Sequence, residues 1–307
     1  MRIARFSVGS GPVRIGRVDL HDDAELALGG DGTGVPAGTR ASGTVVDLSG
    51  VPGVGDSVRE LLPRLAELGP ALTAAEGERF DLAEVTLHAP IDSPRKFLGI
   101  GMNYKEHAAE AALAGIPTPT SQMWFNKQVS CLNDPYGDIV RPRVSEQLDY
   151  EIELGVVIGR AAKDVSVEDA RSYIAGYVVT NDVSVRDWLQ KLSPTFTLGK
   201  SFDTHGPVGP WLTTDDAIAD PLDLGLRLTV NGEVRQEHRT NDMIYNAYEQ
   251  IAYLSQVFTL EPGDILATGT PAGIGAPTQN WLVPGDVVRA QIEGLGFIEN
   301  TVVNWDA

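Results

Sequence analysis

The chain has 307 residues and a formal net charge of −18, from 42 acidic and 24 basic residues. This mean charge repels a polyanion such as nucleic acid, and no long block of Lys and Arg offers a local exception. The single cysteine, Cys131, excludes an internal disulfide, and no run of about 18 apolar residues predicts a membrane span. Because the N-terminus also lacks the apolar core of a signal peptide, we expect a cytoplasmic protein.

Residues 1–90 are expected to form a small α/β N-terminal domain, followed by a larger domain over residues 91–307. The first domain begins with short strands and a Gly-Pro turn, and turn-forming residues at 29–40 predict a loop. Val58 and the leucines that follow it have helical spacing. They predict a helix over 56–69 that a Gly-Pro pair ends.

From about residue 95 onward, short β-branched runs alternate with Gly, Pro and Asp, which predicts many short strands. Asn231-Gly232 is a strong hairpin signal, because both central positions of a type I′ turn need a positive φ. Two helices are expected here, over 166–174 after a Ser and Asp capping pattern, and over 242–258. The prediction is an α+β fold, mostly β, with helices packed around twisted sheets.

The segment 148–159 begins as an acidic strand and then becomes apolar. Because strand side chains alternate, Asp149, Glu151 and Glu153 share one face, which alone indicates a half-buried strand with a charged, solvated side. A second apolar strand ends at Asp182, and strand ends often carry sites because the sheet holds them rigidly. If Glu151, Glu153 and Asp182 converge, their repulsion requires a divalent cation, and oxygen ligands favour Mg²⁺, Mn²⁺ or Ca²⁺ over zinc.

His107 and Glu110 form a candidate acid–base pair. They are three residues apart on a predicted helix with Asn103 as N-cap, so the carboxylate can orient the imidazole. The alternative is a solvated pair on the helix surface. Lys200 is either an exposed loop charge or a cation that meets an anionic oxygen. The Gly-rich segment 267–275 offers hydroxyl and backbone N–H groups to a carboxylate.

Several motifs resemble, in order, those of the fumarylacetoacetate hydrolase family. They are NYKEHAAE, DYEIELGVVIG, VVTNDVSVRD, GKSFDTHGPVGP, VNGEVRQ followed by NDMIYN, and LEPGDILATGTPAGIG. The resemblance covers about residues 90–303, and its Glu-x-Glu, Asn-Asp and Gly-Lys-Ser-Phe series is specific as a set. It implies a C-terminal mixed β-sheet roll with peripheral helices, and a homodimer.

The same resemblance assigns a metal centre and an acid–base pair. Glu151, Glu153 and Asp182 would hold Mg²⁺ or Mn²⁺, with Ca²⁺ as an alternative. His107 and Glu110 would form the dyad of a lid that activates water.

The resemblance also assigns residues to the substrate. Lys200 would stabilise negative charge on it, and Thr270 with Gly269 would hold its carboxylate. Tyr104 and Arg186 are expected to contact it as well.

The expected function is metal-dependent hydrolysis of a C–C bond in a small β-diketone or acylpyruvate-type acid. The alternatives within the family are an isomerase of 2-hydroxy-diene-dioates and a decarboxylase of 2-oxo acids such as oxaloacetate. A third alternative is a non-catalytic protein that Ca²⁺ stabilises. Met102 stands where some acylpyruvate-cleaving members carry Arg, and Leu189 where many members carry Gln, which leaves the substrate open.

Overall fold

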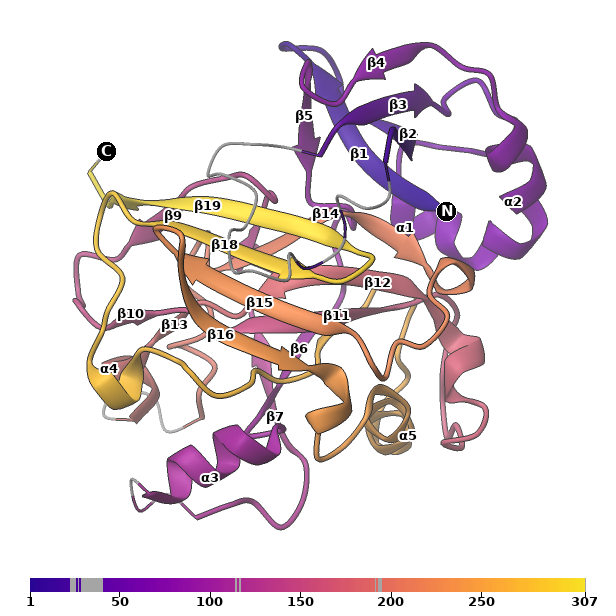
Figure 1. The fold of residues 1–307 in the computed structure, drawn as a ribbon. Coiled ribbons are helices and arrows are strands. Elements are labelled where there is room, and N and C mark those ends of the chain that lie inside the picture. The colour runs from indigo at the N-terminus through magenta and orange to yellow at the C-terminus, as the bar shows by residue number, and fades with distance from the viewer. Residues whose placement is uncertain are drawn as a thin grey trace.

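The computed structural model describes residues 1–22, 26, 28, 41–113, 115, 117–190, 192 and 195–306. Strands dominate this part of the chain and form a 12-stranded, a five-stranded and a two-stranded sheet, with few helices around them (Figure 1). The predicted α+β, mostly β fold is therefore confirmed. The loop predicted at 29–40 lies outside the described residues. None of the described helices is long and apolar enough to cross a membrane.

The N-terminal strands form one end of the large sheet, and short helices lie beside them (Figure 1). The strands are β1 (Arg2–Val8), β2 (Arg14–Leu20), β3 (Gly43–Asp47), β4 (Arg79–Asp81) and β5 (Val85–His88). The helical segments are α1 (Val58–Leu61), the 3₁₀ turn η2 (Leu62–Arg64) and α2 (Leu65–Ala74). The helix predicted over 56–69 is thus broken at its proline-containing middle.

The predicted end of that helix at Gly69-Pro70 is wrong. Pro70 lies inside α2, which continues to Ala74. Leu68 and Leu72 are buried in the core beneath α2. Burying these two side chains outweighs the backbone hydrogen bond that proline cannot make.

The remaining strands form the other end of the large sheet and two smaller sheets. The large sheet continues through β14 (Gly206–Thr214), β12 (Ile174–Asn181), β11 (Ile152–Ile158), β17 (Ile265–Ala267), β6 (Phe97–Gly101) and β7 (Met123–Lys127), and β8 (Leu132–Asn133) pairs with β14. The five-stranded sheet has the order β16 (Glu233–Arg239), β15 (Gly225–Val230), β18 (Val287–Ile292), β19 (Gly296–Asn304) and β9 (Ile139–Arg141). The two-stranded sheet joins β10 (Leu148–Asp149) to β13 (Ser184–Val185).

The main core lies between the large and the five-stranded sheet. Leu154 of β11 and Val179 of β12 belong to the same buried cluster as Leu226 of β15 and Ala290 of β18. A second cluster covers the opposite face of β11 and β12. Every residue of both strands is therefore buried, and the solvated side considered for the acidic strand does not exist.

The Asn231-Gly232 hairpin prediction agrees with the structure. These two residues connect β15 to β16 and have φ values of 53° and 81°. The positive φ at both positions is the conformation that a type I′ turn requires.

Two helix predictions in the larger domain need correction. Only a 3₁₀ turn, η4 (Ala170–Tyr173), forms in 166–174, although Ser166 Oγ does accept the Asp169 N–H at 3.2 Å. In 242–258 the helix α5 starts at Ala247 and ends at Val257, with Asn246 as N-cap. The residues before Asn246 instead form a 3₁₀ turn and an isolated bridge to residue 104.

Strands from both sides of residue 90 belong to the same large sheet. β1 pairs antiparallel with β14, with Ile3 opposite Leu212. The His88 ring forms hydrogen bonds with the Ser7 hydroxyl (3.0 Å) and the Asp134 carboxylate (2.9 Å), and the second of these joins both sides of the expected boundary. The division at 90/91 stays a prediction, as do the homodimer and the cytoplasmic location.

Because β11 is buried on both faces and Leu154 is fully buried, truncating Leu154 is expected to destabilise the protein strongly. Leu154→Ala is expected to lower the free energy of unfolding by about 2–5 kcal/mol, because it leaves a cavity between the sheets. Urea denaturation measures this change. Val257→Ala on the exposed side of α5, where Val257 is 69% exposed, is the control and is expected to change it little. Equal stability of the two variants would contradict the core described here.

Candidate metal centre

Three carboxylates meet where β11 and β12 lie side by side. Ile152 of β11 pairs with Asn181 of β12. Glu151 and Glu153 flank Ile152, and Asp182 follows Asn181, so the register brings all three acids to one place. One oxygen from each carboxylate lies within 4.8 Å of the other two. The structure thus brings together the three residues predicted as metal ligands.

Burial makes this cluster costly unless a cation neutralises it. The exposed fractions of Glu151, Glu153 and Asp182 are 5%, 1% and 0%. Burial, and then the charges of Asp182 and Glu151, raise the pKa of Glu153 well above its ordinary value. Glu153 Oε2 accepts the Gly269 N–H at 2.7 Å, whereas its buried Oε1 has no hydrogen-bond partner among the described residues. Such an oxygen is suited to bind a cation.

Three basic side chains surround the acids. Lys200 Nζ donates to Glu151 Oε2 (2.7 Å) and to Asp182 Oδ2 (2.6 Å). Lys127 Nζ donates to Asp182 Oδ1 (2.6 Å), and Arg186 Nη2 lies 2.6 Å from Glu151 Oε1. Although burial opposes ionisation, Lys200 and Arg186 lower the pKa of Glu151 to about 2.

Lys127 is a site residue that the sequence analysis missed. It ends β7, is fully buried, and also donates to the backbone carbonyls of Lys200 (2.5 Å) and His205 (3.0 Å). Strand alternation places it on the same face as buried Phe125. A lysine on the apolar face of a strand is expected to be buried, and lysine is almost never fully buried unless it is paired. The position of Lys127 two residues after Phe125 is therefore the sequence signal that could have identified it.

Asp149 lies outside the group of three, because the chain leaves the strand ladder between β10 and β11. Its carboxylate accepts the Arg186 Nε–H (2.7 Å) and the backbone N–H groups of Gly275 (2.7 Å) and Ala276 (3.0 Å). Arg186 therefore links Glu151 to Asp149, the acid that holds the Gly-rich loop. Its predicted contact with a substrate stays a prediction.

The pair of His107 and Glu110 forms on α3 (Lys105–Leu113), with His107 Nδ1 3.3 Å from Glu110 Oε2. Both side chains are partly buried. The charge of a protonated His107 would be one of the smaller causes that lower the pKa of Glu151, which indicates that the ring lies near the acids. Its Nε2 is the ring nitrogen that Glu110 leaves available. Figure 1 shows α3 at the end of the molecule opposite the N-terminal strands.

The predicted N-cap role of Asn103 is wrong. Asn103 is buried, and its amide donates to the carbonyls of Tyr245 (2.9 Å) and Thr268 (2.7 Å). Its side-chain oxygen accepts the Tyr245 N–H at 2.9 Å. Near the start of α3 the Glu106 N–H instead points to Asp242 Oδ2, at 3.5 Å. These long-range partners outcompete the local cap.

The other predicted substrate residues lie beside the acids. Tyr104 is fully buried, its hydroxyl has no partner among the described residues, and burial followed by the charge of Glu153 raises its pKa well above the ordinary value. Thr270 Oγ1 donates to the Ile152 carbonyl (2.9 Å) and accepts from Gln236 Nε2 (2.9 Å). The Thr270 hydroxyl thus fixes the Gly-rich loop to β11, and its contact with a substrate carboxylate stays a prediction.

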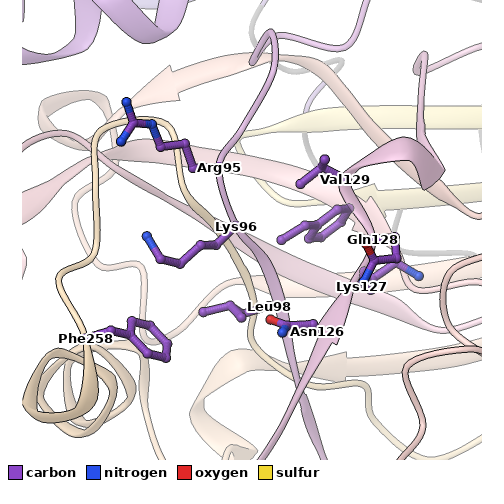
Figure 2. Close-up of a pocket in the computed structure, with 9 residues that line it drawn as sticks. Arg95, Lys96, Leu98, Asn126, Lys127, Gln128, Val129 and Phe258 are labelled. Atoms are coloured by element: carbon purple, nitrogen blue, oxygen red, sulfur yellow. The ribbon is translucent and has the colours of Figure 1, made fainter.

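A cavity of about 410 Å³ shares Lys127 with the centre, and Figure 2 shows the side chains around it. It is lined by the start of β6, the end of β7 and Phe258. Its cations are already paired, Lys96 with Asp264 (2.8 Å) and Arg95 with Glu261 (2.7 Å). Lys127, the third cation of the lining, is paired with Asp182 (2.6 Å), so the cavity adjoins the metal centre although none of the three acids lines it.

The arrangement defines a class of site. Buried carboxylates with only oxygen donors fit a hard divalent cation, and the unpartnered Glu153 Oε1 supports that fit. The ammonium group of Lys200 and the imidazole–carboxylate pair of His107 and Glu110 lie beside the acids. Such groups can transfer protons and stabilise negative charge.

Comparisons with known proteins identify the family. Residues 96–303 match the model of the fumarylacetoacetate (FAA) hydrolase C-terminal domain, and the chain belongs to this family. The predicted family fold is confirmed by solved relatives. Fumarylacetoacetate hydrolase from Exiguobacterium antarcticum has a TM-score of 0.79 and 34% identity, with 99% of each chain covered.

Other relatives carry different names. Maleylpyruvate hydrolase from Sphingobium sp. SYK-6, solved with manganese (II) ion and pyruvate, has a TM-score of 0.77 and 31% identity, with 99% of each chain covered. A mitochondrial oxaloacetate tautomerase from Xenopus laevis is 40% identical over 268 residues, 85% of this chain and 83% of that protein. A 2-hydroxyhepta-2,4-diene-1,7-dioate isomerase from Mycobacterium marinum has a TM-score of 0.76 and 32% identity, with 100% of each chain covered.

Gly269 provides a test of the centre's geometry. Its φ is +102°, and an added Cβ would lie 2.7 Å from Asn103 Cβ, a side chain that its own hydrogen bonds hold in place. Gly269→Ala is expected to cost about 1–3 kcal/mol of stability through backbone strain. It should also weaken Mn²⁺ binding, because the N–H that orients Glu153 moves.

Gly55→Ala is the matched control, since an added Cβ there has no atom within 4 Å and φ is ordinary. Thermal denaturation and Mn²⁺ titration compare the two variants. If Gly269→Ala behaves like Gly55→Ala in both, Gly269 does not hold Glu153 as described.

Proposed function

We propose that this protein is a divalent-metal-dependent enzyme that converts a small anionic 2-oxo acid through its enolate. The observation that carries the proposal is the convergence of three buried carboxylates within 4.8 Å, with one oxygen of Glu153 lacking a hydrogen-bond partner in the part of the chain that the structure describes. Glu151, Glu153 and Asp182 would hold Mg²⁺ or Mn²⁺. When bound, the ion would supply Lewis-acid polarisation of the 2-oxo group.

The protein's own groups would perform the remaining steps. Lys200 would stabilise the negative oxygen of the enolate, since its ammonium group reaches the same cluster. His107 would accept a proton at Nε2 while Glu110 orients the ring through Nδ1. Tyr104 would donate its unpartnered hydroxyl to the bound acid.

The first reaction we propose is keto–enol interconversion of a 2-oxo diacid of the oxaloacetate type. It requires only proton transfer at an enolate. Its support is the 40% and 43% identity to two relatives named as oxaloacetate tautomerases. Relatives at 41% and 42% identity are named only as putative hydrolases, and the solved hydrolases are 31% and 34% identical.

The second candidate is hydrolysis of a C–C bond in an acylpyruvate-type acid. The observation that favours it is the His107–Glu110 pair, at 3.3 Å, beside the acids. In this reaction His107 Nε2 would take a proton from water, which attacks the distal carbonyl. Cleavage would release the same type of enolate, so the two reactions share the centre and differ in the role of water.

Metal removal tests the shared part of the proposal. Exhaustive chelation is expected to abolish turnover, and Mn²⁺ or Mg²⁺ to restore it. Glu153→Gln, which keeps the shape but removes the charge, should lose turnover by at least about 100-fold and should not be rescued by Mn²⁺. Glu67→Gln, on an exposed surface pair with Arg64, is the control and should behave like the wild type. Full activity of the chelated wild-type protein would refute the metal mechanism.

A substrate panel separates the two reactions. The wild-type protein with Mn²⁺ is expected to accelerate the decay of enol oxaloacetate, followed by ultraviolet absorbance, without releasing pyruvate. Acylpyruvates and 2-hydroxy-diene-dioates are assayed in parallel, with pyruvate release as the signature of cleavage or decarboxylation. Release of pyruvate from an acylpyruvate, without any effect on the enol, would replace the first candidate with the second.

A further inference from the structure

We propose that Lys200 is an exchangeable internal counter-ion, which neutralises the acid cluster when no metal is bound and leaves it when a divalent ion binds. This inference rests on the metal centre proposed above. It adds that metal loading itself releases the lysine side chain toward the substrate.

The partners of Lys200 Nζ are the first observation. It donates to Glu151 Oε2 at 2.7 Å and to Asp182 Oδ2 at 2.6 Å, and both acids are members of the cluster of three. Its ammonium group therefore bridges two of the three acids that would hold a divalent ion. Two cations at one pair of buried oxygens repel each other strongly, because the surrounding dielectric is low.

Lys127 supplies the contrast that identifies Lys200 as the exchangeable lysine. Among the described residues, Lys127 Nζ donates to one acid, Asp182 through Oδ1, and its other two hydrogen bonds go to the backbone carbonyls of Lys200 and His205. With three partners, two of which belong to the backbone, its ammonium group is fixed. Among the described residues, the hydrogen bonds of Lys200 Nζ go to acids alone, so an ion that binds these acids removes the interactions that hold the ammonium group there.

The backbone around Lys200 allows its side chain to move while its Cα stays. The Lys200 carbonyl accepts from Lys127 Nζ at 2.5 Å, and its N–H donates to the Phe196 carbonyl at 3.2 Å. Nζ also lies 5.1 Å from the centre of the Phe125 ring, a weak cation–π contact. In the proposed exchange, the backbone contacts stay and a change of side-chain rotamer transfers the ammonium group from the acids to a bound anion.

The inference predicts that removing Lys200 strengthens metal binding. Metal-stripped wild-type protein, Lys200→Met and Lys200→Arg are titrated with Mn²⁺ by calorimetry. Lys200→Met is expected to bind Mn²⁺ at least about tenfold more tightly than the wild type, since the ion no longer competes with a resident cation. Lys200→Arg keeps the competing charge and is expected to remain close to the wild type.

Lys163→Met is the matched control for loss of one positive charge. Lys163 is half-exposed and pairs with Asp164 and with the carbonyls of Ser255 and Gln256. It should leave Mn²⁺ affinity unchanged.

A second measurement keeps the test decisive if metal-free Lys200→Met folds poorly. Its melting temperature without metal should lie below that of the wild type, because the acids then repel each other. Saturating Mn²⁺ should raise that temperature by more than it does in the wild type.

The possible outcomes are separable. Failure of the wild-type protein to bind Mn²⁺ would overturn the metal centre itself. Equal or weaker Mn²⁺ binding by Lys200→Met, with normal binding by the wild type, would overturn only the exchange of Lys200. A crystal structure with Mn²⁺ in which Lys200 Nζ still donates to both acids would do the same.

Discussion

The pairing of β11 with β12 is the constraint on which the centre depends. One register places Ile152 opposite Asn181 and so sets Glu151, Glu153 and Asp182 together inside the protein. Because both strands are buried on both faces, a slip by one residue would move every side chain into the opposite core and disrupt the packing of both cores. Core packing therefore fixes the positions of the three acids, while the basic side chains around them offset part of their repulsion. The centre is rigid because the sheets are.

Parts of the centre could be predicted because their signals are local. Alternation along a strand puts Glu151 and Glu153 on one side, and the apolar run before Asp182 marks a strand end. The partners of these acids could not be predicted in the same way. Lys127 reaches Asp182 across 55 residues of sequence, and the Gly-rich loop meets Asp149 across 126. No pattern within a single segment encodes such contacts.

The helix errors have the same physical origin. Asn103 and the Gly69-Pro70 pair carry ordinary cap and stop signals, but distant backbone groups occupy the Asn103 amide, and buried leucines carry α2 past Pro70. Asn231-Gly232 succeeds because its turn depends on φ values that the two residues themselves prefer. The turn prediction was right because the preferences of its own two residues determine the conformation. The cap and stop predictions were wrong because tertiary contacts stabilise a different local structure by more than the local signals do.

The continuity of the large sheet bears on how the protein can be divided. Residues 96–303 match the family model, yet β14 within them has β1 as its neighbour on the side away from β12. A fragment cut near residue 90 would carry an open strand edge able to recruit another chain. The N-terminal strands thus cover the edge of β14, and their removal is expected to cause self-association through that edge.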